Sequence, residues 1–490
     1  MRAVAPELEG GGPAGLAARL RRHGPALVLL AAFVATRLVA RLVFGLRFDA
    51  DTLHYWHLLD LPVLREDLLR GLLYLHSQPP LFNLGVGLVL QRVPDAHVAG
   101  AFDAVFLATG YLVVAGIHAL LLELGTPRRA ALAFALLQTL STTWLVYESW
   151  LFYTLPVAAL LTWAAVFLAR ATRGSRLAAV AFAAAVLALS WTRATYHPAW
   201  AALSLALLLV ALRGQAPRVV RAARRGALAA LVLVLALPAK NALLVGAFAG
   251  SSWLGMNLAH MTTERLPEAT REEWIRAGAL GPLARVPSFS PLSAFPEELR
   301  AVPPGLPAHP ALTAPLKADG TPNFNHAAYA RIAREYQRAA RVVIARRPDV
   351  YLERVRRAVR TWLRPPTDYI LVVPAREALG AWDRLHSRLL LWASLERRRA
   401  GPTWVLLPAA VLFLLALALR EPAARRRALV LTAFPLLSIA WTAGFGNLLD
   451  VEENNRFRVE VEGLMVALGC WALVEAARGL AAFVRPRPLC

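Results

Sequence analysis

Long apolar stretches alternate with short polar gaps along almost the whole chain. A membrane-spanning helix needs roughly 20 consecutive apolar residues. The stretches that reach or approach this length are 25–46, 98–123, 130–147, 150–169, 177–192, 197–212, 227–250, 403–419, 428–446 and 460–484. One further apolar segment, 79–93, is shorter. The pattern predicts an all-α polytopic membrane protein with about 10–11 transmembrane helices.

The arginines predict how these helices are oriented. They occupy alternate gaps, at 128–129, 170–176, 213–225 and 420–427, and they recur after the last stretch. Because basic residues favour the cytoplasmic side, we expect these gaps, the N-terminal tail 1–24 and the C-terminal tail 485–490 to be cytoplasmic. The gaps expected on the extracytoplasmic side are 47–78, 147–149, 193–197, 251–401 and 447–459. If 79–93 crossed the membrane completely, every later gap would lie on the opposite side from the one that its arginines favour. We therefore expect a re-entrant or tilted half-helix there.

The chain therefore divides into a few parts. Residues 25–250 are expected to form a transmembrane module with a first external loop at 47–78. Residues 251–401 are expected to form an extracytoplasmic, mainly helical region, and 402–484 the C-terminal transmembrane helices. Within the outer region, 325–347 has apolar positions at helical spacing, and 349–363 continues the pattern after Pro348.

Composition and charge narrow the class of protein. The chain has 490 residues, of which 57% are hydrophobic, more than the roughly 45–50% typical of soluble domains. Its net charge of +22 would suit a nucleic acid, but arginines confined to gaps between apolar stretches favour a lipid bilayer and no nucleic-acid partner. The apolar start without a small-residue cleavage site predicts a retained signal-anchor. Cys470 and Cys490 provide neither a disulfide framework nor a Cys-based metal site.

Carboxylates gather in the gaps that are expected to face outward. Asp49 and Asp51 follow the first apolar stretch, Glu148 lies between two long stretches, and 450–453 holds three more acids. A positioned carboxylate can act as a general base, and an ionisable residue close to hydrocarbon is a candidate for function. The alternative is that these residues are solvated, or lie among interfacial aromatic residues at the level of the lipid headgroups.

Cations and histidines occupy the same gaps. Arg193 and His197 lie in the third gap, and Arg456 and Arg458 precede the last stretch. Arginine suits phosphate geometry, while Arg193 could instead snorkel and the later pair could bind the nearby acids. The histidines His54, His57 and His76 could hold a divalent metal together with a loop aspartate, although interfacial histidines are more often structural. No other cofactor is indicated.

These residues resemble the motifs of the GT-C class of membrane glycosyltransferases. The likeness is closest to the branch that contains protein O-mannosyltransferases and bacterial lipid A aminoarabinose transferases. Asp51, followed four residues later by Tyr55, is similar to the acid of the first external loop in that class. The segment from His76 through Gln78 to Pro79-Pro80-Leu81 is similar to the Lys or His that precedes a Pro-Pro-Leu motif.

Two further positions extend this resemblance. Glu148 occupies the place of a second acid that follows a pair of helices, and Arg456-Phe457 resembles the Arg-aromatic pair that opens the final helices. The likeness covers about 25–250 and 403–484. The chain departs from the class in having His76 where Lys is frequent, and Asp49-Ala50-Asp51 where an adjacent acidic pair is usual.

The resemblance implies an inverting transferase of the plasma membrane. Such an enzyme moves a sugar from a polyprenyl-phosphate donor to a protein, lipid or glycan acceptor on the extracytoplasmic side. It implies Asp51 as the general base, with Asp49 and Glu148 as further catalytic candidates. The substrate-binding candidates are His76, Gln78, Tyr55, Arg193, His197, Arg456 and Arg458.

Two other classes of protein stay open at this point. A transporter or flippase for lipid-linked sugars would line a translocation path with buried charges. A polytopic glycan ligase or polymerase would place its key residues in 251–401. The transferase alternative predicts Asp51 and Glu148 in one outward cavity together with Arg456.

Overall fold

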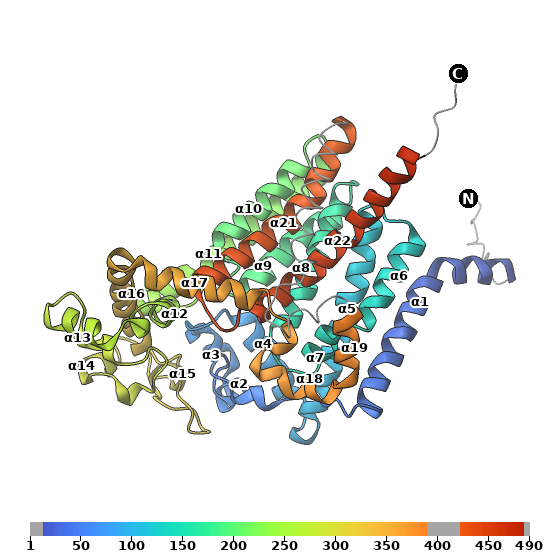
Figure 1. The fold of residues 1–490 in the computed structure, drawn as a ribbon. Helices are drawn as coiled ribbons and strands as arrows, with labels where there is room; N and C mark the ends of the chain where they lie inside the picture. Colours follow the sequence, from blue (N-terminus) through green and yellow to red (C-terminus); the bar gives the residue numbers. More distant parts are fainter. Residues whose placement is uncertain (1–12, 390–421, 485–490) are drawn as a thin grey trace, which may run out of the picture.

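The computed structural model describes the backbone of residues 13–389 and 422–484 (Figure 1). Helices make up most of this part of the chain, and it contains no β-strand beyond two isolated bridges. The expected all-α class is therefore confirmed. The expected span at 403–419 and the tail 485–490 lie outside the described residues.

Five helices of the described chain are long and apolar enough to cross a membrane. They include segments of α1 (Pro13–Leu42), α5 (Asp95–Glu123), α8 (Thr154–Ala171), α11 (Pro217–Val245) and α21 (Pro422–Leu449). A sixth span arises if α6 (Arg128–Thr139) and α7 (Thr142–Glu148) count as one, although they are bent by 55°. The protein is thus a polytopic membrane protein by length and composition of its helices.

This number is smaller than the sequence predicted. α9 (Arg176–Thr192) and α10 (Pro198–Ala211) are apolar but have only 17 and 14 residues, about 26 and 21 Å at the usual helical rise. α22 (Asn454–Val484) has 31 residues and begins with a charged segment. The first helix also begins earlier than expected. α1 starts at Pro13 and includes 13–24, which had been predicted to belong to the cytoplasmic tail.

The segment 79–93 forms one short helix. α4 (Pro80–Arg92) has 13 residues, about 20 Å at the usual rise, which is too short to cross the hydrocarbon core. It follows η1 (Asp51–His54), α2 (Leu61–Glu66) and α3 (Leu68–Tyr74) in the first external loop and packs against α2 and α9. This length agrees with a half-helix that does not cross.

The connections between helices sort into two ends of the bundle. At one end, Glu123 pairs with Arg173 at 2.8 Å, and Gln215 donates to the Thr172 carbonyl at 2.8 Å. At the other end, Ser252 donates its backbone N–H to the His76 carbonyl at 3.0 Å. Figure 1 shows α12–α17 at this second end and the last turns of α22 at the opposite end. The alternate gaps of the arginine pattern therefore lie at opposite ends, as predicted.

The outer region has a small apolar core of its own. It contains α12 (Leu254–Met261), α13 (Glu268–Arg276), α14 (Glu297–Arg300), α15 (Pro310–Thr313), α16 (Ala328–Arg346) and α17 (Pro348–Trp362). The predicted helical stretches 325–347 and 349–363 are confirmed by α16 and α17. α16 buries Tyr329, Ile332 and Tyr336 at helical spacing against α12. Gly255 of α12 meets the Ala333 carbonyl, a contact that any Cβ would block.

The chain then returns across the outer end of the bundle. After η5 (Pro366–Asp368) and η6 (Ile370–Val372), α18 (Val373–Leu379) and α19 (Ala381–Leu389) pack against α7. Trp382 donates its indole N–H to the Leu140 carbonyl at 3.1 Å. This return places Tyr369 over the first turn of α22, where the candidate site lies.

Candidate functional site

Four outward gaps meet at the end of the bundle that carries the outer region. Asp49 pairs with the segment after Glu148: its backbone N–H donates to the Ser149 carbonyl at 2.7 Å, and its carbonyl accepts from Leu151 at 3.2 Å. Trp441 of α21 donates its indole N–H to the Thr195 carbonyl at 2.7 Å. Segments that are far apart in the sequence are thereby brought to one place.

Arg456 is the charged centre of this junction. It lies in the first turn of α22 and is only 1% exposed. Its guanidinium carbon lies 4.8–5.5 Å from the centroids of four aromatic rings, which belong to Phe152, Tyr153, Tyr369 and Phe457. Rings at this distance stabilise a buried cation. We call Arg456, Glu453 and these four aromatic residues the Arg456 cluster.

Glu453 balances the charge of Arg456. It forms an ion pair with Arg456 and accepts a hydrogen bond of 2.9 Å from the Tyr369 hydroxyl. Burial alone would raise the pKa of Glu453, but the charge of Arg456 and these hydrogen bonds lower it to about 2. The carboxylate is therefore ionised at neutral pH. The Arg456 Nε atom has no hydrogen-bond partner among the described residues, so the guanidinium keeps one unused donor.

The first external loop packs directly against this cluster. The His57 ring stacks on Tyr55 with centroids 5.2 Å apart, and it meets Phe152 edge-on at 5.2 Å. Burial, reinforced by the charge of Arg456, lowers the pKa of His57 to about 3. Burial and the charge of Glu453 raise the pKa of Tyr55 to about 12. Both side chains are therefore neutral at physiological pH, and the His57 Nδ1 atom has no hydrogen-bond partner among the described residues.

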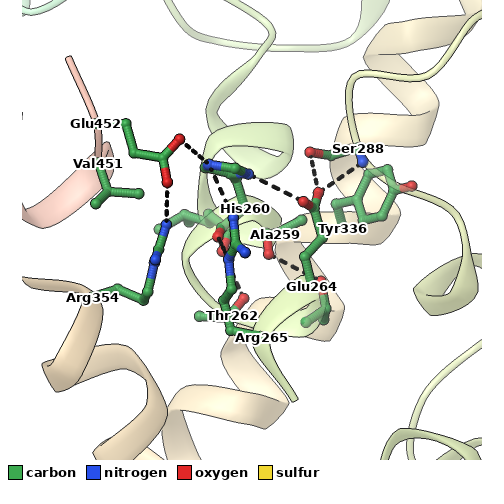
Figure 2. A network of polar contacts seen from close by, with 12 residues as sticks. Ala259, His260, Thr262, Glu264, Arg265, Ser288, Tyr336, Arg354, Val451 and Glu452 are labelled. Atoms are coloured by element: carbon green, nitrogen blue, oxygen red, sulfur yellow. Dashed lines mark hydrogen bonds and ion pairs between the residues drawn. The ribbon is translucent and has the colours of Figure 1, made fainter. Parts of the chain in front are cut away.

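The outer region positions the loop that carries Glu453. The preceding residue, Glu452, has a left-handed φ of 91°, which costs a non-glycine residue roughly 1–2 kcal/mol. Its carboxylate is bound by Arg354 at 3.2 Å and lies 3.8 Å from His260, which also contacts Glu264 at 3.1 Å (Figure 2). These contacts tie α12 and α17 to the backbone that directs Glu453 toward Arg456.

The two loop aspartates differ in their role. Both are exposed, and the Asp49 carboxylate accepts the backbone N–H of Asp51 at 2.8 Å. Thr52 donates its hydroxyl to the Leu151 carbonyl at 2.7 Å. Asp49 thus shapes the turn, whereas Asp51 presents its carboxylate four residues before Tyr55.

Glu148 is not part of the Arg456 cluster and pairs with Arg37 instead. Its carboxylate is 2% exposed and accepts two hydrogen bonds from Arg37 of α1, at 2.8 and 2.5 Å. The same Arg37 donates to the Thr139 carbonyl at 2.6 Å, so it binds both sides of the bend between α6 and α7. The ion pair with Arg37 compensates the charge of the buried Glu148 carboxylate, so its burial needs no catalytic role. A catalytic role for Glu148 stays a prediction without support from this geometry.

The other candidate arginines are paired with carboxylates. Arg193 forms an ion pair with Glu460, which also accepts a hydrogen bond of 2.9 Å from Tyr196. Arg458 donates to the Trp362 carbonyl at 2.6 Å and lies 4.0 Å from Glu462, one turn later in α22. Arg456 and Arg458 could each bind phosphate or pair with an acid. The structure shows pairing for both, with Glu453 and Glu462 respectively.

The remaining candidates, His197, His76 and Gln78, are not members of the Arg456 cluster. His197 caps α10, because its Nδ1 atom accepts the Ala199 N–H at 3.2 Å. His76 is fully buried, and its Nδ1 atom contacts the Ser252 hydroxyl at 2.9 Å. Gln78 is half-buried in the same turn.

The described residues offer no ready metal site. No group of three or more His, Cys, Asp or Glu side chains in that part of the chain is placed to hold a metal ion. His54 instead contacts Asp319 at 2.9 Å. The possible divalent metal remains a prediction without a geometric candidate.

Three important residues were not selected from the sequence. Glu453 lies three residues before Arg456, a spacing that pairs side chains on one helix turn. Arg37 is a charge inside the first apolar stretch, which is a signal of function or pairing. Tyr369 had no such signal, because only the return of the chain after α17 brings it here.

Comparisons with models of protein families, with curated proteins and with solved structures found no match for this chain. A proposal of function therefore rests on the sequence motifs and on the geometry of these residues.

Proposed function

We propose that this protein is a GT-C-like glycosyltransferase of the plasma membrane. It would move a sugar from a polyprenyl-phosphate donor to a protein, lipid or glycan acceptor on the extracytoplasmic side. The observation that carries the proposal is the Arg456 cluster, a buried cation at the membrane end where the acidic first loop, the last helix and the outer region meet.

Arg456 is suited to stabilise the leaving phosphate. Negative charge grows on the lipid phosphate as the bond to the sugar breaks, and a fixed cation in a water-poor site lowers the energy of that state. Arg193 and Arg458 are paired with carboxylates inside the bundle. In the ligand-free state Glu453 neutralises Arg456, and the phosphate would compete with Glu453 for the guanidinium.

Asp51 is suited to activate the acceptor. An acceptor hydroxyl is a weak nucleophile, and a positioned carboxylate can take its proton as the hydroxyl attacks the anomeric carbon. Asp51 is exposed, and its backbone is held by Asp49. Direct attack would invert the anomeric centre. Tyr55 follows Asp51 by four residues, and its ring meets Phe152 of the cluster edge-on at 6.0 Å, so it would contact the donor.

The lipid tail of the donor explains why such an enzyme is built into a membrane. The cluster lies at the ends of α8, α21 and α22, so a polyprenyl chain could extend along the apolar helices while its phosphate reaches Arg456. His76, His197 and Gln78 would then shape the surrounding loops rather than contact the reacting atoms.

One observation favours a second candidate, a polytopic glycan ligase or polymerase. The outer region contributes Tyr369 to the cluster, and its Trp253 meets His57 edge-on at 5.4 Å. A ligase would use the same outer surface but would require a lipid-linked oligosaccharide rather than a single sugar. Supplying both kinds of donor in the experiment below distinguishes the transferase from the ligase.

The experiment is sugar transfer by the purified protein in lipid vesicles. Labelled polyprenyl-phosphate sugars and lipid-linked oligosaccharides are supplied in turn with peptide, lipid and glycan acceptors. Asp51→Asn should lower kcat by about 10²–10⁴-fold, the usual contribution of a general base, and Arg456→Lys by about 10²-fold or more. Asp95→Asn, an exposed aspartate at the start of α5, is the matched control and should leave transfer unchanged.

Each result has a clear reading. Transfer that persists in Asp51→Asn would move the base to Asp49 or Glu148. Transfer only from oligosaccharide donors would favour the ligase, and folded protein that transfers nothing from any donor would count against both enzymes.

A further inference from the structure

One histidine links the outer region to the loop that carries Glu453. His260 lies in α12, and its side chain is 28% exposed, so its ring can exchange protons with the solution. Its Nδ1 atom lies 3.1 Å from the Glu264 carboxylate, and its Nε2 atom lies 3.8 Å from the Glu452 carboxylate. Figure 2 shows the ring between these two acids.

The partners of His260 determine where a neutral ring carries its proton. Burial alone would raise the pKa of Glu264, but hydrogen bonds from His260 and Ser288 lower it to about 2, so this carboxylate only accepts. A neutral imidazole has one N–H, and that N–H must therefore face Glu264 from Nδ1. The Nε2 atom is then an acceptor, and the Nη2 atom of Arg265 lies 3.4 Å away to donate to it.

Protonation of His260 exchanges the partner of Nε2. The added proton turns Nε2 into a donor, and the charged ring repels Arg265 and attracts the Glu452 carboxylate. Arg354 and Arg357 of α17 bind one oxygen of that carboxylate, at 3.2 and 3.3 Å, which leaves the other oxygen for the imidazolium. Glu452 is thus held at both oxygens when the ring is charged and at one when it is neutral.

Three further titratable groups surround this network in the described chain. Burial raises the pKa of Tyr336 in α16 and of Tyr351 in α17, so both hydroxyls keep their protons. Burial and the charge of Glu453 raise the pKa of Asp450, in the loop itself, to about 7. Asp450 therefore titrates in the same pH range as an imidazole and requires its own control.

The anchors of the loop leave Glu452 and Glu453 between them. Val451 is 2% exposed in an apolar cluster with residues of α12 and α17, and α22 begins at Asn454. Glu452 has a left-handed φ of 91°, a conformation that persists only while surrounding contacts hold it. A lost contact at its carboxylate therefore weakens the hold on the peptide that directs Glu453 toward Arg456.

We propose that His260 is a positioning residue for the Arg456 cluster, because its proton sets how firmly Glu453 is held against Arg456. This inference rests on the proposed function, in which the donor phosphate competes with Glu453 for the guanidinium. When His260 is protonated, the loop is fixed, Glu453 stays paired and the phosphate binds less tightly. When His260 is neutral, the loop can turn and the phosphate replaces Glu453 more easily.

The first test follows the proton link without any substrate. Thermal unfolding of the full-length protein in a neutral maltoside detergent is measured at about pH 5.5 and pH 8, which brackets the titration of imidazole. The proteins are wild type, His260→Gln, Glu452→Gln and the double variant. The series is repeated with Asp450→Asn, which removes the other group that titrates here.

The expected result is a pH-dependent link between the two side chains. Glu452→Gln should lower the Tm of the wild type more at pH 5.5 than at pH 8. In the His260→Gln background the same change should lower the Tm equally at both pH values, because no imidazolium is present. An equal loss at both pH values in the wild-type background would overturn the proposal.

The second test measures the KM for the polyprenyl-phosphate donor in the transfer assay. This donor is a phosphodiester, so its charge is constant over the range. In wild type the KM should be about two- to fivefold higher at pH 5.5 than at pH 8, the usual size of a partly exposed ion pair, and in His260→Gln it should be equal at both. At each pH, kcat should be the same in the two proteins. His309→Gln, which removes a histidine 3.4 Å from Asp67 in the same region, should keep the wild-type ratio.

The two readouts separate failure of this inference from failure of the proposed function. If the wild type transfers no sugar, the proposed function fails and the competition with phosphate fails with it, while the unfolding data still decide whether the proton on His260 holds Glu452. A KM ratio that persists in His260→Gln, or a KM that is lower at pH 5.5 in the wild type, would overturn the effect on Arg456.

Discussion

Replacing Arg37 by methionine should destabilise the protein more than any single change at its exposed surface. Arg37 and Glu148 are 5% and 2% exposed, and the carboxylate receives two hydrogen bonds from this arginine. Without Arg37, the Glu148 carboxylate stays buried without a cation, and the Thr139 carbonyl at the α6–α7 bend loses its donor. Both groups lie in a bundle from which water is excluded.

The size of the effect follows from this burial. Breaking a buried ion pair by removing one partner costs about 3–5 kcal/mol, whereas replacing both partners by apolar residues of similar volume is often nearly neutral. Arg37→Met should therefore lose about 3–5 kcal/mol, and Arg37→Met/Glu148→Met should recover most of it. The control is Arg41→Met, one turn later in α1, whose partner Asp103 is 20% exposed. Because this pair is less buried than Arg37–Glu148, its loss should cost less.

The assay is unfolding of the purified protein in mixed micelles with increasing dodecyl sulfate, followed by helical ellipticity. The wild type, Arg37→Met, Glu148→Met and the double variant together form a cycle that gives the coupling between the two residues directly. If Arg37→Met proved no less stable than Arg41→Met, or if the double variant were as unstable as the single one, the account of a buried compensating pair would be refuted. The cycle also separates structure from catalysis at Glu148: sugar transfer that survives in the stable double variant would exclude this carboxylate as a base.

Three further predictions concern other parts of the fold. Gly110→Ala should cost about 1–3 kcal/mol, because a Cβ atom there would overlap the Glu148 carboxylate; thermal unfolding beside Gly100→Ala, which has open space in the same helix, tests this. Burial lowers the pKa of His76 to about 3, so between about pH 3 and 6.5 the unfolded chain binds more protons at this residue than the folded one. The stabilising contribution of neutral His76 is complete above pH 6.5 and falls as the pH decreases, by up to about 1.4 kcal/mol per unit; unfolding at pH 7 and 5 should show less pH dependence in His76→Asn. Glu452→Ala should be less stable than Glu452→Gly by about 1 kcal/mol in the same assay, because only glycine accepts the left-handed backbone without strain.

The sequence determined those features that depend on neighbouring residues. Apolar length and arginine-rich gaps predicted an all-α membrane protein whose connections alternate between two ends, and both features are present in the described chain. Helical spacing predicted α16 and α17, because apolar residues on one face favour a helix wherever that face can be buried. The short length of 79–93 likewise predicted a helix that does not cross.

The tertiary structure decided which charged residues become partners. Glu148 was expected beside Asp51 and Arg456, but helix packing brings Arg37 to it from 111 residues away. Glu453 takes the corresponding place beside Arg456, and Tyr369 joins it from the outer region. Sequence spacing limits such pairings only within one helix turn. Beyond that distance, the energy of a buried charge depends on which segments the fold brings against it, and this is settled only when all the helices are packed.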